Sequence, residues 1–591
     1  MVLMVMIIMF ILSAAAYQVS QGNIGLIAIA SSNEKALYAA EQGYNKCLWR
    51  LNNEDGSFFK DIDPSPEKVT YDSKSYNMYE LPDGPNYRLR ILVPLEDVPG
   101  LNTQEENNNQ RIIRCTGWDT SEPDRLRTIE VEVYKRTFTQ FAIANDSERS
   151  EGGDPLYWLT GEAVYGPLHT NDTLFVRGTP TFYGPVTYVN GINISPAENI
   201  YNPNIFRKGN ARVTEKMSFP PSNPELKAHA RINGHYYNGR TCIYLREDGG
   251  YDARYYDQTT GRWYYNGVEY AFIPTRDGNP PNFLQTNLWW AREIRDERAD
   301  NSDDKMFRKI VRDSSGNIIE SQSPYYRSFA DLRNSIGHLE LPANGVIYVD
   351  GATGSGNTGG LSSERKFDIS LGNVFVSGKL DGRLTIAAAN NIYITAHDPC
   401  DWQRPDYNTS SWYDAKPGVT YSSTDFQQVF ENGEWSYTKV LGEGDDMLGL
   451  VADYKVQVMH YNWPSGYDDV RYRGSIKGLF DFDNYCWSFL NLGVPIDKAP
   501  NNIYLHAAIY AKEQYFGFEA YDVGLVKDTA YLVGSIAQKY RGPMGVQYFD
   551  GYKKNYSHDP RLLYDSPPMF PDPANSGWRS SRWDEITNHI E

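Results

Sequence analysis

The chain opens with MVLMVMIIMFILSAAA at residues 1–16, and the first charged side chain is Glu34. A polar break at 18–23 is followed by a second apolar run, IGLIAIA, at 24–30. The first run alone spans about 16 residues, close to the shortest apolar helix that crosses a bilayer. The alanines at 14–16 also fit the cleavage site of a secretory signal, although no Lys or Arg precedes the run.

Helical patterning continues beyond both apolar runs. Five apolar residues recur three or four positions apart and form one helical stripe: Leu37, Ala40, Tyr44, Leu48 and Leu51. The first proline is Pro64, so nothing before it obstructs a helix. The pattern predicts a helix over 1–53, hydrophobic first and amphipathic later. A retained membrane helix and a cleaved signal remain the two interpretations of this end.

The composition narrows the classes of protein. With 57 Lys+Arg against 75 Asp+Glu, the net charge of -18 argues against a nucleic-acid partner, which needs clustered cations. Hydrophobic residues make up 40% of the chain, enough for a sizeable core. The 49 Gly, 33 Pro and 45 Tyr residues favour a turn-rich, β-rich body.

The five cysteines are widely scattered: Cys47, Cys115, Cys242, Cys400 and Cys486. Their spacing excludes a dense disulfide scaffold and a zinc ribbon, since no CxxC occurs. One or two disulfides remain open, for example Cys47 with Cys115 or Cys400 with Cys486. The odd number leaves at least one free or intermolecular thiol.

The region after the predicted helix contains strand-like runs at 87–94, 112–115 and 127–134. The last run, RTIEVEVY, alternates with a period of two, which is typical of a half-buried strand. We therefore predict a small antiparallel sheet over 54–145, packed on the second half of the helix.

Short β runs bounded by Gly, Asn or Pro recur from residue 161 onward. Runs at 374–376, 384–386 and 392–394 lie eight to ten residues apart, which is the spacing of one coil of a parallel β-helix. The alternation places eight aliphatic residues inside: Leu174, Val176, Val374, Val376, Leu384, Ile386, Ile392 and Ile394. Thr385 is predicted to face outward, so that its truncation should cost little.

The predicted fold class is therefore α+β, mainly β. It comprises the helix at 1–53, the sheet domain at 54–145, and a β-helix-like body at 150–591. An antiparallel sandwich is the alternative for the body. Polar and aromatic stretches at about 200–340 and 401–444 interrupt the pattern and are predicted to be insertions.

Few motifs in the sequence resemble known catalytic, cofactor-binding or metal-binding sites, and each departs from the motif that it resembles. GSGNTG at 354–359 matches GxGxxG but lacks a following apolar helix. The acidic stretches DERADNSDD at 296–304 and Asp445–Asp446 do not match a calcium loop. We expect the pairs His397–Asp398 and His558–Asp559 to make turn hydrogen bonds.

Two carbohydrate hypotheses remain from this search. Asp350, Asp368 and Asp381 would form a glycan-cleaving site only if they converge on adjacent coils. Aromatic clusters at 263–265, 289–290 and 412–413 could stack on sugars, although such residues more often pack under loops. The sequence predicts no catalytic, cofactor-binding or metal-binding residue.

Two stretches of the helix region carry a resemblance to a known family. Residues 35–51, KALYAAEQGYNKCLWRL, resemble the A-x-x-A-A-E-x-G-x-x-x-A-L-x-x-L end of the N-terminal helix in PilX-type pilus-assembly proteins. The helix as a whole resembles that of type IV pilins. The printed residues begin directly on the apolar run, with no basic leader ending in Gly, and carry Val5 where most pilins carry Glu. Three interpretations stay open: the true start lies upstream, this is the processed form, or the protein is a divergent membrane-anchored relative.

The body also resembles large bacterial surface proteins with PilX-like N termini. GPLHTN at 166–171, GTPTFYGPV at 178–186 and GRLTIAA at 382–388 carry this similarity, as does a looser pattern over 534–568. The resemblance implies a minor-pilin-like protein of the cell envelope and partners among pilin-like subunits. It implies no reaction.

The expected function is therefore a non-enzymatic one. It is a pilin-like, membrane-anchored or pilus-associated surface protein with a structural, assembly or adhesive role. A surface or glycan ligand is possible, and no cofactor is expected. The alternative is a secreted parallel β-helix enzyme acting on carbohydrate, or a sugar-binding protein.

Overall fold

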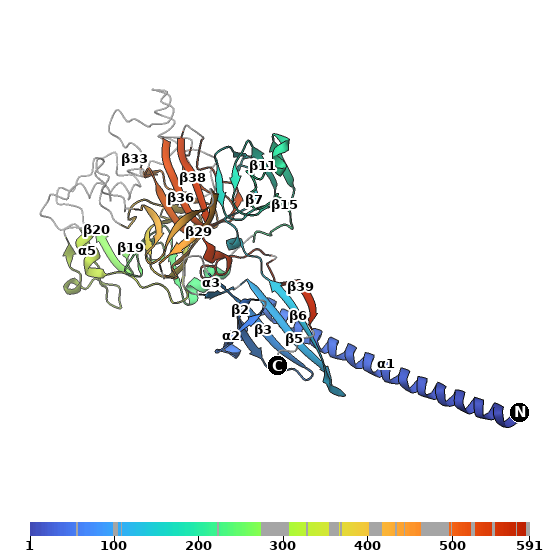
Figure 1. Cartoon of the computed structure of the whole chain (residues 1–591). Coiled ribbons are helices and arrows are strands. Elements are labelled where there is room, and N and C mark those ends of the chain that lie inside the picture. The colour runs from blue at the N-terminus through green and yellow to red at the C-terminus, as the bar shows by residue number, and fades with distance from the viewer. Residues whose placement is uncertain are drawn as a thin grey trace, which may run out of the picture. The chain divides into compact units, whose positions relative to one another are not determined.

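The computed structural model describes residues 1–586 except 55–56, 72, 98–103, 108, 221–223, 273–306, 327–328, 354–365, 367–368, 401–415, 432–433, 443, 463–495, 498, 522–525, 547–549 and 575. The chain forms two compact units (Figure 1). The first contains Met1–Val98, Asn102–Thr137 and Asn575–Glu591, and the second contains Pro99–Leu101 and Phe138–Ala574. A long helix, a small antiparallel sheet and a large body of strands confirm the predicted fold class.

The first unit begins with α1 (Val2–Asn53), a single helix of 52 residues. This confirms the helix predicted over 1–53. From residue 32 onward the side chains on one face are buried: Ser32, Ala36, Ala39, Ala40, Cys47 and Leu51. The small residues let α1 approach the sheet closely, because a Cβ added at Gly117 would overlap the backbone of Ala36 and Ala40.

The sheet of the first unit is antiparallel and six of its strands follow one path. In order they are β1 (Glu67–Tyr71), β2 (Lys74–Leu81), β3 (Tyr87–Asp97), β5 (Gln110–Asp119), β6 (Glu122–Tyr134) and β39 (Arg579–Ile586). A short helix, α2 (Phe58–Ile62), adds Phe58 and Phe59 to the core that the sheet shares with α1. The predicted small sheet is therefore present.

The last strand of this sheet comes from the far end of the chain. β39 pairs antiparallel with β6, whereas the sequence had assigned these residues to the body at 150–591. Its sequence, RSSRWDEI, is mostly exposed and lacks an alternating apolar pattern, so no period-two signal marks it. The second unit is thus inserted between two adjacent strands, and two chain segments connect it to the first.

The body is built on stacked parallel ladders, which is β-helix-like and does not fit the antiparallel sandwich alternative. In the longest ladder every neighbouring pair is parallel. Its order is β16 (His235–Asn238), β23 (Val346–Asp350), β25 (Arg383–Ala388), β30 (Met447–Ala452), β34 (Ile503–Ala511), β36 (Val526–Tyr540), β7 (Ile143–Ser147), β10 (Leu168–Thr170), β13 (Val186–Tyr188) and β15 (Arg212–Val213).

This order differs from the order of the strands along the chain. β7 is the first strand of the body, yet it lies between β36 and β10. The chain therefore enters the ladder in its interior, at β7, and the next strands, β10, β13 and β15, stack on one side of β7. The following ladder strand, β16, lies at the opposite end, and the later strands stack in sequence order from there until β36 pairs with β7.

Two further parallel ladders complete the core. One contains β24 (Val374–Leu380), β27 (Gly418–Tyr421), the first residues of β34 and β36, β38 (Asp550–His558), β9 (Ala163–Tyr165) and β12 (Thr181–Phe182). The other contains β17 (Thr241–Leu245), the first residues of β24, β26 (Ile392–Ile394), β31 (Val456–Val458) and β35 (Phe516–Phe518). Three shorter strands stack parallel beside them: β8 (Trp158–Leu159), β11 (Thr173–Arg177) and β14 (Gly191–Ser195).

All eight aliphatic residues predicted to lie inside the body are buried in its main hydrophobic cluster. The prediction for Thr385 was wrong in one respect, because this outward-facing side chain is also buried. Its hydroxyl donates a hydrogen bond of 2.5 Å to the carbonyl of Pro568. The C-terminal segment covers the outer face of β25, and the sequence pattern of β25 carries no sign of that cover.

The two predicted insertions are not simple insertions. β16 and β17 come from 200–340 and β27 comes from 401–444, and all three belong to parallel ladders. Beyond β17 the chain forms an antiparallel layer: β18 (Tyr251–Asp257), β19 (Arg262–Tyr265), β20 (Val268–Phe272), β21 (Phe307–Lys309) and β22 (Tyr325–Tyr326). A hairpin of β28 (Asp425–Glu431) and β29 (Glu434–Leu441) follows β27. In these two stretches of the sequence, ladder strands alternate with projecting hairpins. Their similar composition therefore did not distinguish the ladder strands from the hairpins.

Candidate functional site

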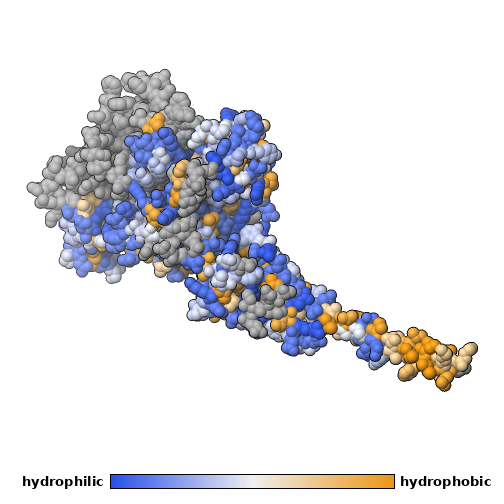
Figure 2. All heavy atoms as spheres, in the orientation of Figure 1, coloured by the Kyte–Doolittle hydropathy of each residue, from blue (hydrophilic) through white to orange (hydrophobic). Residues whose placement is uncertain are grey.

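The first half of α1 is an exposed apolar surface. Every described side chain from residue 3 to 31 is exposed, for example Leu3 at 75%, Phe10 at 74% and Ile27 at 68%. Figure 2 shows this half as a largely hydrophobic rod. At 1.5 Å per residue it is about 45 Å long, against about 30 Å for the hydrocarbon core of a bilayer. By length and composition, α1 is able to cross a membrane.

The second half of α1 also carries apolar side chains on its outer face. Tyr38 and Trp49 are 65% and 59% exposed. They lie eleven positions apart, so they point in nearly the same direction from the helix. The inner face meanwhile packs on the sheet. Two exposed aromatic side chains therefore lie on one outer face of α1 where the helix is already supported by folded structure, with the exposed polar residues Gln42 and Asn45 between them.

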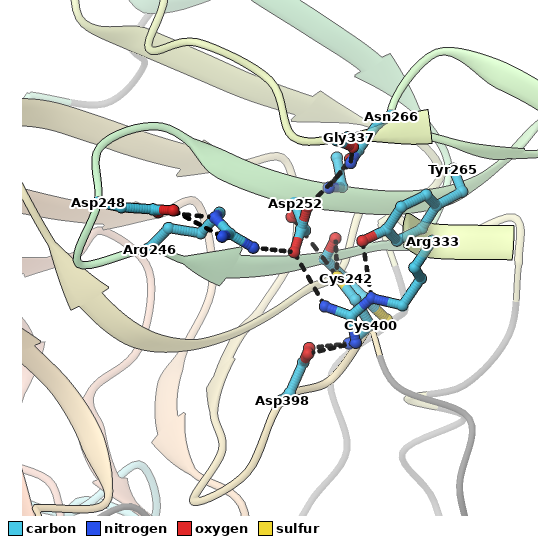
Figure 3. Close-up of polar contacts among 11 residues, drawn as sticks. Cys242, Arg246, Asp248, Asp252, Tyr265, Asn266, Arg333, Gly337, Asp398 and Cys400 are labelled. Atoms are coloured by element: carbon cyan, nitrogen blue, oxygen red, sulfur yellow. Dashed lines mark hydrogen bonds and ion pairs between the residues drawn. The ribbon is translucent and has the colours of Figure 1, made fainter. Parts of the chain in front are cut away.

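The body contains a buried charged cluster centred on Arg333, in the helix α5 (Phe329–Ile336) (Figure 3). The Arg333 guanidinium lies 2.9 Å from Asp252 Oδ2 and 2.8 Å from Asp398 Oδ2. Its Nε donates a hydrogen bond of 2.8 Å to the hydroxyl of Tyr265. One side chain thus joins α5, strands β18 and β19, and the loop after β26.

Asp252 is the most enclosed member of this cluster, at 2% exposure. It also accepts a hydrogen bond of 2.8 Å from Asn266 and lies 3.4 Å from Arg246 (Figure 3). Burial lowers the pKa of Arg333, but Asp398 and Asp252 outweigh this and raise it above its ordinary value. The arginine therefore stays charged and paired. This chemistry suits a clamp between segments rather than proton transfer.

A second buried charge cluster lies where the first strand of the body, β7, meets β36. Glu148 is fully buried, and its Oε2 is 3.4 Å from Arg541. Arg541 also lies 3.6 Å from Glu162, which pairs with Lys554 at 2.9 Å. The Arg541 guanidinium stacks 3.5 Å from the centre of the Trp158 ring.

The two carboxyl groups of this cluster differ in pKa. Burial raises the pKa of Glu148 despite Arg541. Burial would also raise the pKa of Glu162, but Lys554 and Arg541 outweigh it and lower the pKa to about 2. Divergent carboxyl pKa values occur in acid–base sites. Here, however, Glu148 is wholly enclosed. Its partner Arg541 directly follows β36, and Glu148 directly follows β7, so the cluster closes the seam between β36 and β7.

The structure does not bring Asp350 and Asp381 together. Asp350 ends β23, whereas Asp381 precedes β25, and the parallel register places Val349 opposite Ala388 at the end of β25. The length of β25 therefore separates them, roughly 16 Å. Paired catalytic carboxylates lie about 5 to 10 Å apart. Asp368, the third candidate, lies outside the described residues.

Asp350 is instead committed to structural partners. It accepts a hydrogen bond from the hydroxyl of Tyr236 and pairs with Lys227 at 2.6 Å. Burial opposes ionisation, but these partners outweigh it and lower the pKa of Asp350. The carboxylate is thus ionised and fixed on the side of the ladder.

The other polar candidates make turn or capping contacts. Asp398 accepts the backbone N–H of Cys400 at 2.7 Å, and Asp559 accepts the backbone N–H of Arg561 at 3.0 Å. Asp446 accepts backbone N–H groups from Gly382 and Ser423, both at 2.8 Å. These contacts confirm the expectation of turn hydrogen bonding for Asp398 and Asp559.

Among the residues that the structure describes, no group of three or more His, Cys, Asp or Glu could hold a metal ion. The GxGxxG run at 354–359 and the acidic stretch at 296–304 lie outside that part of the chain. Neither prediction is therefore tested.

The aromatic cluster at 263–265 packs against other side chains. Tyr265 is 1% exposed, Tyr264 stacks on Tyr255 at 5.3 Å, and Trp263 meets Tyr256 edge-on at 5.3 Å. This arrangement is a packed layer on β18 and β19 rather than an open sugar platform. The clusters at 289–290 and 412–413 lie outside the described residues.

Sequence reasoning missed the clamp around Arg333 and the seam around Arg541. Both bring together residues far apart in the chain, so no local spacing marks them. The available signal was weaker: Arg333 lies within a short amphipathic segment, and Arg541 follows the long strand β36.

The chain was compared with protein families, curated proteins and solved structures. A family model described as "Domain of unknown function (DUF4900)" matches residues 102–190, which span parts of both units. No curated protein matches the sequence. Among solved structures, the competence-associated pilin ComZ from Thermus thermophilus is 9% identical, with 94% of this chain and 97% of that chain covered. Its TM-score is 0.25, too low to support a conclusion about fold or function.

Proposed function

We propose that this chain is a pilin-like, membrane-anchored surface protein with a structural, assembly or adhesive role. The observation that carries the proposal is α1, whose exposed, uncharged first half continues into a second half packed on an antiparallel sheet. The first half suits a bilayer, and the second half suits attachment to a folded domain.

The proposal puts the body on the extracytoplasmic side of the membrane. Two chain segments connect the body to the first unit, and they continue into the adjacent strands β6 and β39. A load on the body would therefore be shared by two covalent connections. The stacked ladders supply a stiff support from which the hairpins project, and such hairpins are where binding residues tend to occur.

We propose other pilin-like subunits as partners of α1. The outer face that carries Tyr38 and Trp49 is the surface that such a partner would contact outside the bilayer. Exposed aromatic side chains are enriched at protein interfaces. A surface or glycan ligand for the hairpin layer remains part of the proposal.

The proposal includes no enzymatic activity. Two observations support this: Asp350 and Asp381 are separated by the length of β25, and Asp350 is held by Lys227 and Tyr236. The check is incubation of the purified chain with bacterial polysaccharides, with release of reducing ends as the readout. Depolymerisation that is lost in Asp350→Asn or Asp381→Asn would place the protein among enzymes instead.

Protease protection tests the anchor and its orientation. Protease is added to intact spheroplasts that produce the full chain, and the surviving fragment is identified by mass spectrometry. We expect digestion of the body and survival of a membrane-bound fragment that includes residues 3–31. A protected body, or a full chain recovered from the medium, would contradict the proposal.

A further inference from the structure

Cys242 and Cys400 are neighbours in space although they are far apart in the chain. The Cys400 thiol lies with its Sγ 3.3 Å from the carbonyl oxygen of Cys242 and 3.5 Å from that of Asp252 (Figure 3). Cys242 is 6% exposed and Cys400 is fully buried. In this structure both are thiols.

The surroundings hold the two cysteines in place. Cys242 lies within β17, which pairs on both sides, with β18 and with β24. Cys400 is held by its backbone N–H, which donates to Asp398, and Asp398 in turn pairs with Arg333. A pair of thiols that is already positioned loses little entropy on joining.

A cation also lies beside the sulfur of Cys242. The Arg254 guanidinium is 3.7 Å from Cys242 Sγ and donates a hydrogen bond of 3.1 Å to the carbonyl of Pro399, next to Cys400. Arg254 therefore ties the loop that carries Cys400 to β18, beside Cys242.

We propose that Cys242 and Cys400 form an intramolecular disulfide when the chain meets a disulfide oxidant. The Cys242 thiolate attacks a small-molecule disulfide and releases one thiol. The Cys400 thiolate then attacks the mixed disulfide and releases the second. The oxidant is reduced by two electrons, and the two cysteine protons pass to the released thiols.

The bond would join β17 to the loop after β26, two segments of the same parallel ladder. The chain between positions 242 and 400 contains the antiparallel strands β18 to β22 and the helix α5. The disulfide would close this long segment at the point where the Arg333 clamp already holds it. Its formation in cells rests on the extracytoplasmic placement proposed above, because oxidising compartments preserve such bonds.

The test uses the full chain in detergent, equilibrated with oxidised glutathione in urea below the unfolding transition so that the buried thiols are reached. Remaining thiols are alkylated in denaturant, and the digest is mapped without reduction. We expect a peptide that links Cys242 to Cys400. Alkylation of both residues, or a Cys400–Cys486 link, would overturn the proposal.

Variants provide the second readout. Oxidation should raise the melting temperature of the wild-type body by several degrees, and a reductant should reverse the rise. The Cys242→Ser and Cys400→Ser variants should lose the response, whereas Cys115→Ser, which lies in the first unit, should keep it. An equal response in Cys242→Ser would contradict the assignment. Because the experiment is done in vitro, its failure is distinguishable from failure of the membrane-anchor proposal.

Discussion

Asn52 and Trp578 join the last turn of α1 to the returning end of the chain by two hydrogen bonds. The backbone N–H of Trp578 donates to Asn52 Oδ1 at 2.7 Å, and Asn52 Nδ2 donates to the Trp578 carbonyl at 3.3 Å. Trp578 itself is buried in the core that α1 shares with the sheet. The second connection to the body is thus fixed directly to the proposed anchor helix.

Removal of this contact should loosen β39 without unfolding the sheet. Two hydrogen bonds are worth about 1–2 kcal/mol, so Asn52→Ala should speed hydrogen exchange over 576–586 by roughly five- to thirtyfold. Asn53→Ala is the matched control, because Asn53 Nδ2 donates to the Trp49 carbonyl within the helix. Equal exchange in the two variants would mean that Asn52 does not hold the returning strand.

A charge in the first half of α1 should weaken the membrane anchor. A lysine at mid-bilayer costs about 2.5–3.5 kcal/mol on insertion scales, so Ile8→Lys should release the chain from membranes or prevent its assembly. Gln42→Lys adds the same charge on the exposed side of the second half and should remain bound. Membrane fractionation measures both. Normal retention of Ile8→Lys would refute the anchor.

The inner and outer faces of β25 should differ in their sensitivity to truncation. Ile386 is fully buried in the main cluster, so Ile386→Ala should cost about 2–5 kcal/mol of unfolding free energy. Thr385→Ala should cost about 1 kcal/mol, because it removes the hydrogen bond to Pro568. Urea unfolding of the full chain provides the comparison. Similar losses for the two variants would show that the inside–outside assignment is wrong.

Acid should weaken the seam between β36 and β7 through Glu162. Its pKa is lowered from 4.5 to about 2 in the folded chain, so its contribution to stability is complete above pH 4.5 and falls as the pH drops toward 2. The contribution amounts to about 3 kcal/mol. The stability difference between wild type and Glu162→Gln should therefore shrink on acidification, mostly by about pH 3. A pH-independent difference would exclude this role.

Local patterns in the sequence were sufficient to predict the long helix, several strands and the side chains that face the core. The stripe from Leu37 to Leu51 predicted α1, and the alternation around Ile386 predicted which side chains fill the body. These predictions rest on helix and strand periodicity, which a few neighbouring residues determine. They needed no knowledge of which strand lies beside which.

The arrangement of the strands was beyond such patterns. Nothing in the sequence of β7 indicates that it pairs with β36, nearly the whole body later, or that β39 returns to β6. Parallel pairing leaves the same alternation whatever the order of the coils. The same holds for the candidate functional features. The sequence predicted the apolar first half of α1, but it did not predict the Arg333 clamp, because the clamp depends on contacts among distant segments.

The mass of the mature chain distinguishes a retained anchor helix from a cleaved signal peptide. The protein is isolated from the membrane fraction of producing cells, and its intact mass and N-terminal peptide are determined. We expect a chain that retains the apolar first half of α1, whether or not an upstream leader has been trimmed. Loss of about 16 residues at the alanines of 14–16, with the remainder in the medium, would show a cleaved signal peptide and contradict the account.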